Sequence, residues 1–316
     1  MLRLLTLALL AFAASAQAQL APGPVKIVVA FPPGGSTDIT ARLIAPKLSE
    51  KWGQPVIVEN KPGAGANIGT DYVAKSAPDG STLLLATTAI AISARVYEKL
   101  PYDALKDLAP VTLISTIPNI LVVNPDVPAA NIGEFIAYAK AHPGKLNFAA
   151  PGAASGQRMT FELIKQLTGA DIVMVPYKGG APALQATLSG EVQAMIVNVV
   201  EATKYVQAAR VRALAATTLA RAPQLPQVPT LAETVAPGLD ASVWQGILAP
   251  AGTPAPTIAK INADVAAALA SADVKSKLEG LGMKVQPGTP AQFGQFLRAE
   301  IDKWGKVARA AKISIH

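Results

Sequence analysis

Short apolar runs alternate with amphipathic stretches along most of the chain. The runs at residues 25–31, 55–60 and 81–87 are continuous, as expected of strands buried on both faces. Helical periodicity fills residues 36–51 and returns near residue 66. Pro46 lies inside the first helix, where we expect a kink or a local break because proline lacks a backbone donor.

The same alternation continues to the end of the chain. Residues 254–312 are rich in helical pattern with one short strand. Further strands are predicted at residues 110–115, 119–124, 145–150, 171–177, 191–198, 210–218, 244–250 and 283–287. Strands that alternate with helices predict an α/β fold with mostly parallel sheets.

Two segments indicate that the chain crosses between two lobes. The segment "TIPNILVVN" joins two apolar runs without a helix, and residues 222–250 form a long proline-rich stretch. The stretches "VIVENKPGAGANIG" and "LNFAAPGAASGQR" also resemble each other, which suggests two similar units. We therefore expect a discontinuous first lobe, residues 22–118 and 243–316, and a second lobe, residues 119–242.

Residues 1–18 form a different kind of segment. "MLRLLTLALLAFAASAQA" has an early arginine, an apolar stretch and small residues at Ala16 and Ala18. This pattern predicts a secretory signal peptide cleaved after Ala18. A bilayer span needs about 20 apolar residues, and this run is shorter. We expect an exported, soluble periplasmic protein, and the absence of cysteine excludes disulfides, thiol chemistry and a lipid-anchored cysteine.

Composition narrows the possible partners. Hydrophobic residues make up 51% of the chain and charged residues 16%, which is typical of a packed globular protein. The net charge is +7, which mildly favours an anionic ligand. The basic residues are scattered without a basic–aromatic stripe, so we expect no nucleic-acid partner.

Catalytic side chains are scarce. His142 and His316 are the two histidines, and neither accompanies a nucleophile motif such as G-x-S-x-G. Metal ligation by histidine or cysteine is excluded, and no acidic cluster has ligand spacing. We expect neither an enzyme nor a cofactor. A secreted hydrolase acting on a carboxylated substrate is the alternative, and it lacks an obvious base.

Residues 63–69, "GAGANIG", resemble a dinucleotide-binding fingerprint. They follow a strand and open a helix, but their spacing is G-x-G-x-x-x-G, one residue longer than the Rossmann form. The next strand ends in threonines and not in an acidic residue. The pattern therefore disfavours nucleotide binding.

Four glycine-rich turns stand at strand-to-helix junctions: "FPPGGSTD", "NKPGAGAN", "APGAASG" and "YKGGAPA". The first turn of a helix carries unpaired N–H groups and the positive end of the dipole, which suits a carboxylate. Such turns also simply end strands and begin helices. Ser36, Thr37 and Ser155 add hydroxyl donors. Asp38 either stabilises its helix dipole or contacts a cationic group, and Lys178 either faces solvent or contacts an anion.

Several motifs resemble one receptor family. "FPPGGSTDITAR", "VENKPGAGANIG" with "PDGSTLLLAT", "LVVNP", "YKGGAPALQATLSGEVQ", and "LPQVPTLAE" followed by "WQGILAPAGTPAP" are similar to the TctC or Bug-type receptors of tripartite tricarboxylate transporters. The resemblance implies a bilobal type II periplasmic-binding-protein fold, the Venus flytrap. It also implies a carboxylate between the lobes, held partly through waters by the loops Phe31–Asp38 and Ala150–Gly156.

The family's pocket positions map onto both predicted lobes. The ligand-binding residues that the resemblance implies are Phe31, Pro33, Gly34, Gly35, Ser36, Thr37, Asp38, Asn60, Ala64, Gly65, Ala66, Thr87, Thr88, Gly152, Ala153, Ala154, Ser155, Tyr177, Lys178, Gly179, Asn198, Val199 and Trp244.

The resemblance further implies a periplasmic receptor that delivers a small carboxylate to the large and small integral membrane subunits of such a transporter. We expect a monomer. A receptor that feeds a sensor kinase remains an alternative. The family's ligands include dicarboxylates, tricarboxylates, acidic amino acids and aromatic acids such as nicotinate. The lack of obligatory charged residues in the matching loops favours a monocarboxylate or an aromatic acid.

Overall fold

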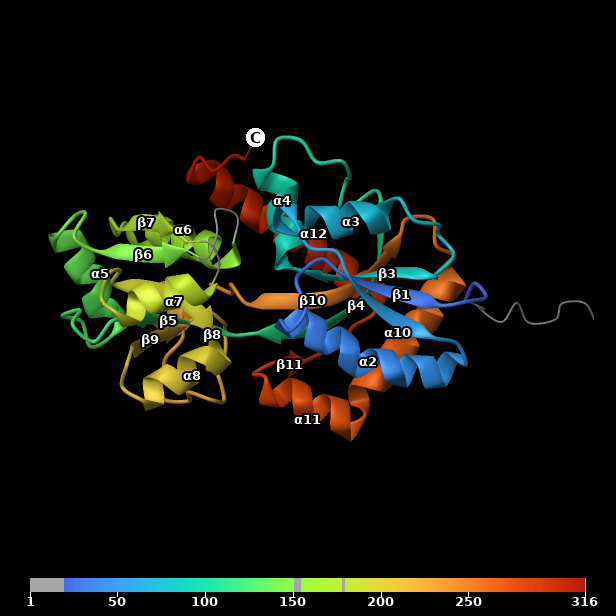
Figure 1. The fold of residues 1–316 in the computed structure, drawn as a ribbon. Coiled ribbons are helices and arrows are strands. Elements are labelled where there is room, and N and C mark those ends of the chain that lie inside the picture. The colour runs from blue at the N-terminus through green and yellow to red at the C-terminus, as the bar shows by residue number, and fades with distance from the viewer. Residues whose placement is uncertain (1–19, 151–154, 178–179, 316) are drawn as a thin grey trace, which may run out of the picture.

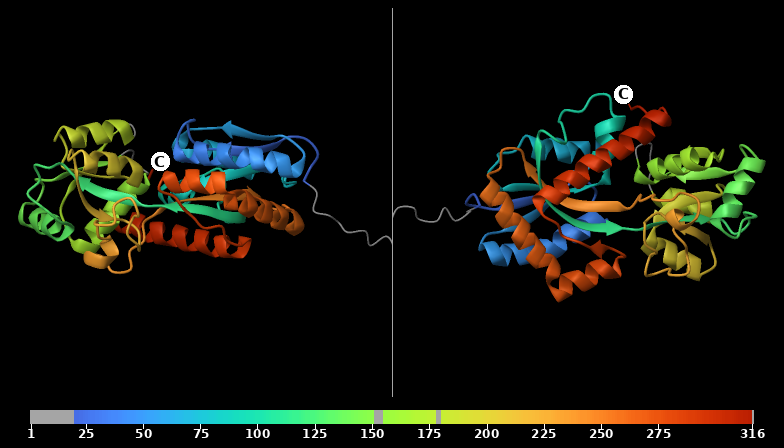
Figure 2. Two further views of the ribbon diagram at one scale, coloured as in Figure 1. Left: turned by 90° about the horizontal axis from the view of Figure 1, so that it is seen from below. Right: turned by 180° about the vertical axis from the view of Figure 1, so that it is seen from behind.

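The computed structural model describes residues 20–150, 155–177 and 180–315. The described chain forms two α/β lobes side by side, each built on one sheet (Figures 1 and 2). The predicted signal peptide, residues 1–18, lies outside the described residues. Within the described part, none of the helices has the length and hydropathy that a membrane span requires.

The first lobe contains a six-stranded sheet in the order β11-β4-β10-β3-β1-β2. Its strands are β1 (Val25–Val29), β2 (Val56–Asn60), β3 (Thr82–Thr87), β4 (Leu108–Ile117), β10 (Val243–Pro250) and β11 (Lys284–Val285). Strand β1 pairs in parallel with β2 and β3, whereas β10 runs antiparallel to β3 and β4 and β11 antiparallel to β4.

The second lobe contains a five-stranded sheet in the order β7-β6-β8-β5-β9. Its strands are β5 (Asn119–Val123), β6 (Asn147–Ala150), β7 (Val173–Pro176), β8 (Ala194–Asn198) and β9 (Arg212–Ala216). Strand β6 is parallel to β7 and β8, but β5 is antiparallel to β8 and β9. The expectation of mostly parallel sheets is therefore wrong, because an apolar run indicates burial on both faces and carries no information about direction.

Two segments of the chain run between the two sheets, and one buried threonine forms hydrogen bonds with both of them. Strands β4 and β5 belong to different sheets although only Pro118 separates them. Thr217 follows β9, and its N–H donates to the Asn119 carbonyl at 2.9 Å. The Ala241 N–H donates to the Thr217 carbonyl at 2.8 Å, and the Thr217 hydroxyl donates to the Ala241 carbonyl. Thr217 thus ties together the two segments that run between the sheets.

Helices cover both faces of the first sheet. They are α2 (Ser36–Trp52), α3 (Asn67–Ala74), α4 (Thr88–Val96), α10 (Ala255–Ala270), α11 (Ala272–Gly280) and α12 (Pro290–Ala310). Leu83 and Leu85 of β3 enter the core under α2 and α10, whereas Leu84 and Ala86 enter the core under α3, α4 and α12 (Figure 1). This two-sided burial explains the continuous apolar runs of the sequence.

The sequence predicts a kink or a local break at Pro46. Helix α2 runs through Pro46 without interruption, so a break is wrong. Pro46 lies on the exposed face of the helix, and Arg42, whose carbonyl loses its donor, is also exposed. Water satisfies a carbonyl at such a position, which lowers the cost of an internal proline.

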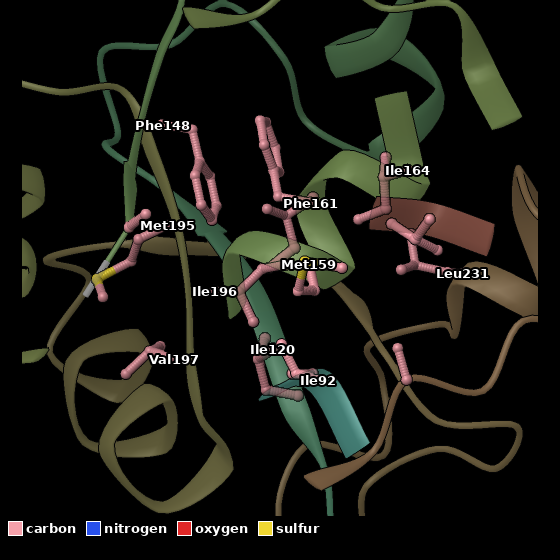
Figure 3. Close-up of a cluster of buried hydrophobic side chains, with 14 of the residues drawn as sticks. Ile92, Ile120, Phe148, Met159, Phe161, Ile164, Met195, Ile196, Val197 and Leu231 are labelled. Atoms are coloured by element: carbon pink, nitrogen blue, oxygen red, sulfur yellow. The ribbon is translucent and has the colours of Figure 1, made fainter. Parts of the chain in front are cut away.

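The helices of the second lobe are α5 (Ile132–Ala141), α6 (Gly156–Thr168), α7 (Gly180–Leu188), α8 (Val199–Gln207) and the short α9 (Leu231–Thr234). In the core of this lobe Phe148 stacks on Phe161 with ring centroids 3.6 Å apart (Figure 3). Ile92 of α4 lies near Ile120 of β5 in the same cluster, so the two lobes share a continuous apolar contact.

We expect Gly246→Ala to destabilise the first lobe. A Cβ on Gly246 would lie 2.9 Å from two ring carbons of Phe293 and closer still to its Cζ, and Phe293 is 1% exposed. Overpacking of this kind costs about 1–3 kcal/mol. Gly280→Ala is the matched control, because Gly280 ends α11 with no neighbour within 4 Å of the added carbon. Urea unfolding should show a loss for Gly246→Ala alone, and equal stabilities would contradict the packing described.

Candidate functional site

A cleft of about 800 Å³ separates the facing ends of the two lobes. The first lobe contributes the loop after β1, the N-terminal end of α4 and a wall around Tyr97, and the second lobe contributes the N-terminal ends of α6 and α7. The residues that line it are Phe31, Pro32, Pro33, Gly35, Ser36, Thr37, Gly65, Thr87, Thr88, Ala89, Tyr97, Ser155, Gly156, Gln157, Gly180, Val243 and Ile315.

The first turn of α2 opens into this cleft. Gly35 is the N-cap residue with an extended backbone, and among the residues that the structure describes no side chain caps this end. The first helical hydrogen bond runs from the Ile39 N–H to the Gly35 carbonyl at 2.9 Å. The N–H groups of Ser36 and Thr37 precede that bond, so they have no carbonyl partner within the helix. Anions bind readily at such a helix end.

Asp38 holds the loop before α2 in place. Its side chain is buried, with the residue 3% exposed. One carboxylate oxygen accepts hydrogen bonds from the Gly34 N–H at 3.0 Å and from Arg42 Nε at 2.9 Å, and the other accepts from Asn60 Nδ2 at 2.9 Å. Asn60 Nδ2 also donates to the Phe31 carbonyl. Both carboxylate oxygens are therefore used inside the lobe, and Asp38 and Asn60 position the loop without lining the cleft.

The Asp38 carboxyl is strongly acidic for a physical reason. Its pKa is lowered from 3.8 to about 2, chiefly by the hydrogen bond from Arg42 and then by the Gly34 and Asn60 donors, while burial opposes them. Because the folded-state pKa lies below the ordinary value, the charged form stabilises the fold.

Three hydroxyl groups beside the α2 terminus are already oriented. The Ser36 hydroxyl oxygen accepts from Gln245 Nε2 at 3.3 Å, Thr87 accepts from the Ala89 N–H at 3.2 Å, and Thr88 accepts from the Trp244 N–H at 3.0 Å. A hydroxyl that accepts in this way keeps its own hydrogen for donation. All three can therefore donate to an acceptor in the cleft.

The structure does not bring the Trp244 side chain to the cleft. Trp244 is completely buried, and its indole nitrogen donates to Glu300 at 3.0 Å. Its ring packs edge-to-face on Phe293. Val243 lines the cleft instead, because successive side chains of a strand point to opposite faces.

Other implied positions also serve contacts within or between the lobes. Tyr177 donates its hydroxyl to Glu191 at 2.8 Å, and Asn198 caps α8 by accepting from the Val200 N–H. Val199 is buried, and the backbone of Gly282 in the first lobe packs closely against it. None of Tyr177, Asn198 and Val199 lines the cleft. Gly152, Ala153, Ala154, Lys178 and Gly179 lie outside the described residues.

Residues 63–66, the first part of the "GAGANIG" stretch, form a left-handed turn, and Asn67 begins α3. Ala64 and Ala66 have φ angles of 47° and 81° on either side of Gly65, which lines the cleft. Left-handed backbone is costly for alanine, and such strain concentrates at functional sites. Gly69 has a packing role, because a Cβ there would lie 2.8 Å from the Ala30 Cβ and 2.9 Å from the Lys61 carbonyl.

Several lining residues were not among the individually predicted ligand-binding residues. Pro32, Gly156 and Gly180 lie within the glycine-rich turns of the sequence analysis, and Gln157 directly follows one of them, so the turns indicated this part of the cleft. Ala89, Tyr97, Val243 and Ile315 also line the cleft without having been selected. Ile315 reaches the cleft through a backbone bridge to Tyr97, and no local sequence pattern predicts a contact between residues so far apart in the sequence.

A second hollow of about 620 Å³ lies beside β9. Arg212 lines it, but its guanidinium donates to the carbonyls of Pro125, Val127 and Ala129. The interlobe cleft, with its uncapped helix end, is therefore the better candidate site.

We expect Asp38→Asn to lower stability in a pH-dependent way. The folded-state pKa of Asp38 is about 2, below its ordinary value of 3.8, so its contribution is present above pH 4 and is lost as the pH falls through 2. The difference between wild type and variant should be on the order of 2 kcal/mol at pH 7 and should shrink toward pH 2. Urea unfolding at several pH values measures it, and a constant difference would contradict the assigned role.

The family comparison agrees with this architecture. The model of the family described as "Tripartite tricarboxylate transporter family receptor" matches residues 40–313. The protein BugT of Bordetella pertussis is 39% identical over 288 residues, which cover 90% of this chain and 88% of that protein.

Solved structures show the same fold. A protein of R. palustris solved with adipate is 37% identical, with a TM-score of 0.81 over 93% of this chain and 99% of that chain. MatC from Rhodopseudomonas palustris, with bound malate, is 35% identical, with a TM-score of 0.78 over 91% of this chain and 99% of that chain. The periplasmic binding protein BugD gives 30% identity and a TM-score of 0.78, over 93% of this chain and 99% of that one. These findings confirm the predicted bilobal periplasmic-binding-protein fold and the family resemblance. The chain belongs to the TctC family, the receptors of tripartite tricarboxylate transporters.

Proposed function

We propose that the cleft binds a small organic acid, with the carboxylate at the first turn of α2. The observation that carries this proposal is the uncapped N-terminus of α2, which opens into the cleft. The oriented hydroxyls of Ser36, Thr87 and Thr88 belong to residues that line the same cleft. The relatives solved with adipate and malate support a carboxylate as the ligand class.

The energetics of such a site are adequate without a cationic side chain. A hydrogen bond to a charged acceptor contributes about 1.5–3 kcal/mol net. Micromolar affinity requires roughly 8 kcal/mol. Two backbone N–H groups and two or three hydroxyls reach that range, provided that they are held in place before the ligand arrives. The Asp38 network supplies that preorganisation.

The second lobe would complete the site from the opposite side. Gly156, Gln157 and Gly180 stand at the N-terminal ends of α6 and α7 across the cleft, and Ser155 caps α6 by accepting from the Arg158 N–H. The residues predicted at 152–154, 178 and 179 remain proposed contacts on this side. In this proposal the lobes comprise residues 22–118 with 243–316 and residues 119–242. The ligand stabilises a closed state about the segments tied by Thr217.

The biological setting follows from the family. The chain would be exported, cleaved after Ala18 and active as a periplasmic monomer that delivers its ligand to the large and small membrane subunits of the transporter. The alternative is that the ligand-bound receptor signals to a sensor kinase and does not deliver its ligand to a transporter. Among the described lining residues there is no histidine, cysteine or acidic side chain, so none of them offers the hydrolase alternative such a base.

We expect Gly35→Leu to abolish binding and leave the protein folded. The backbone at Gly35 is one that leucine adopts without strain, and the nearest atom to an added Cβ is the Pro32 carbonyl oxygen at 4.0 Å. The added side chain would occupy the cleft beside Ser36. A thermal-shift screen of organic acids identifies the tightest binder, and calorimetry with that acid should show at least 100-fold weaker binding.

Gly280→Leu is the control, since Gly280 is exposed on α11 and does not line the cleft. It should bind like wild type. Wild-type affinity in Gly35→Leu would count against the α2 terminus as the carboxylate site.

A further inference from the structure

One end of the cleft is walled by residues from two distant parts of the chain. Tyr97 and Ile315 form a one-residue parallel bridge, in which the Ile315 N–H donates to the Val96 carbonyl at 2.7 Å and the Glu98 N–H donates to the Ile315 carbonyl at 3.1 Å. The Ser314 hydroxyl donates to Glu98 at 2.9 Å. Two backbone hydrogen bonds of Ile315 and the side-chain hydrogen bond of its neighbour Ser314 therefore hold Ile315 at this wall.

The wall stands far from the polar end of the cleft. Thr88 begins α4 and Tyr97 directly follows its last residue, and both line the cleft. A helix rises 1.5 Å per residue, which places them about 13 Å apart along the α4 axis. Figure 1 shows the C-terminal end of the chain beside α4. The cleft therefore runs along α4 from hydroxyl and N–H donors to an apolar wall.

The Tyr97 hydroxyl is already engaged at this wall. It donates to the Ala64 carbonyl at 3.3 Å, and a Cβ on Gly65 would lie 3.0 Å from it. What Tyr97 offers the cleft is therefore its ring. Glu98 and Lys99 follow Tyr97 in sequence, but neither lines the cleft, and Lys99 lines a neighbouring hollow that Tyr97 also borders.

The two described side chains of this wall, the Tyr97 ring and the Ile315 chain, offer a carboxylate neither a cation nor a free donor, and no lining side chain in the described ranges is charged. Burying a carboxylate against apolar side chains without a partner is strongly unfavourable. A methylene chain or an aromatic ring, in contrast, gains by burial there.

We propose that the ligand is a monocarboxylate with an apolar aliphatic or aromatic body, and that Tyr97 and Ile315 determine this specificity. The proposal rests on the proposed function, since the carboxylate must occupy the α2 terminus for the body to reach the wall. This preference for a monoacid would distinguish the chain from the two relatives solved with adipate and malate, because adipate and malate are diacids.

Calorimetry with matched acids tests the proposal. Hexanoate and adipate have the same carbon count and differ in one carboxylate, and octanoate and suberate form a longer pair. We expect the wild-type chain to bind each monoacid at least tenfold more tightly than its diacid. Ile315→Lys should weaken hexanoate binding and strengthen adipate binding, each about tenfold, because it places a cation on the wall. Leu219→Lys is the matched control, because Leu219 is 56% exposed and does not line the cleft.

The outcomes separate this proposal from the one on which it rests. Tighter binding of both diacids by wild type, or an unchanged preference in folded Ile315→Lys, would overturn the specificity role and leave carboxylate binding intact. Failure of every acid in the thermal-shift screen to bind would overturn both. If Ile315→Lys does not fold, Ile315→Ala replaces it. A several-fold loss of hexanoate affinity without a gain for adipate would then support the proposal, and unchanged affinities would refute it.

Discussion

Backbone N–H groups at the start of α2 have no helical acceptor, and the cleft is organised around them. Such donors must find a partner, and a glycine N-cap cannot supply one from a side chain. The loop 31–35 therefore has to hold these donors in a fixed direction while leaving them accessible. That requirement explains why the loop contains small residues and why hydrogen bonds to the Asp38 and Asn60 side chains hold its backbone.

An anion site made from backbone donors and hydroxyls differs from one made from lysine or arginine. Its donors have fixed positions, so it selects by the geometry of the acceptor more than by total charge. The buried negative charge of Asp38 is compensated locally by Arg42 and by two neutral donors, which limits its repulsion of a ligand carboxylate. The rest of the cleft then determines which ligand is preferred, and there Tyr97 meets Ile315 from a distant part of the chain.

Much of this arrangement could be predicted from the sequence, because it depends on local patterns. The strands, the helix that begins at Ser36 and the glycine-rich turns are encoded by neighbouring residues, and the family resemblance placed them in a bilobal fold. Strand direction was predicted wrongly because burial on both faces is compatible with either direction. Trp244 was assigned to the ligand although Val243 next to it lines the cleft, since only the pleat register separates the two. Ile315 reaches the cleft through a long-range bridge that no local signal reveals.

The most direct test of the central claim is a crystal structure of the chain with a bound organic acid. The account predicts carboxylate oxygens about 3 Å from the backbone nitrogens of Ser36 and Thr37, the usual distance for such hydrogen bonds. A carboxylate held only by lysine or arginine side chains, away from the start of α2, would contradict it.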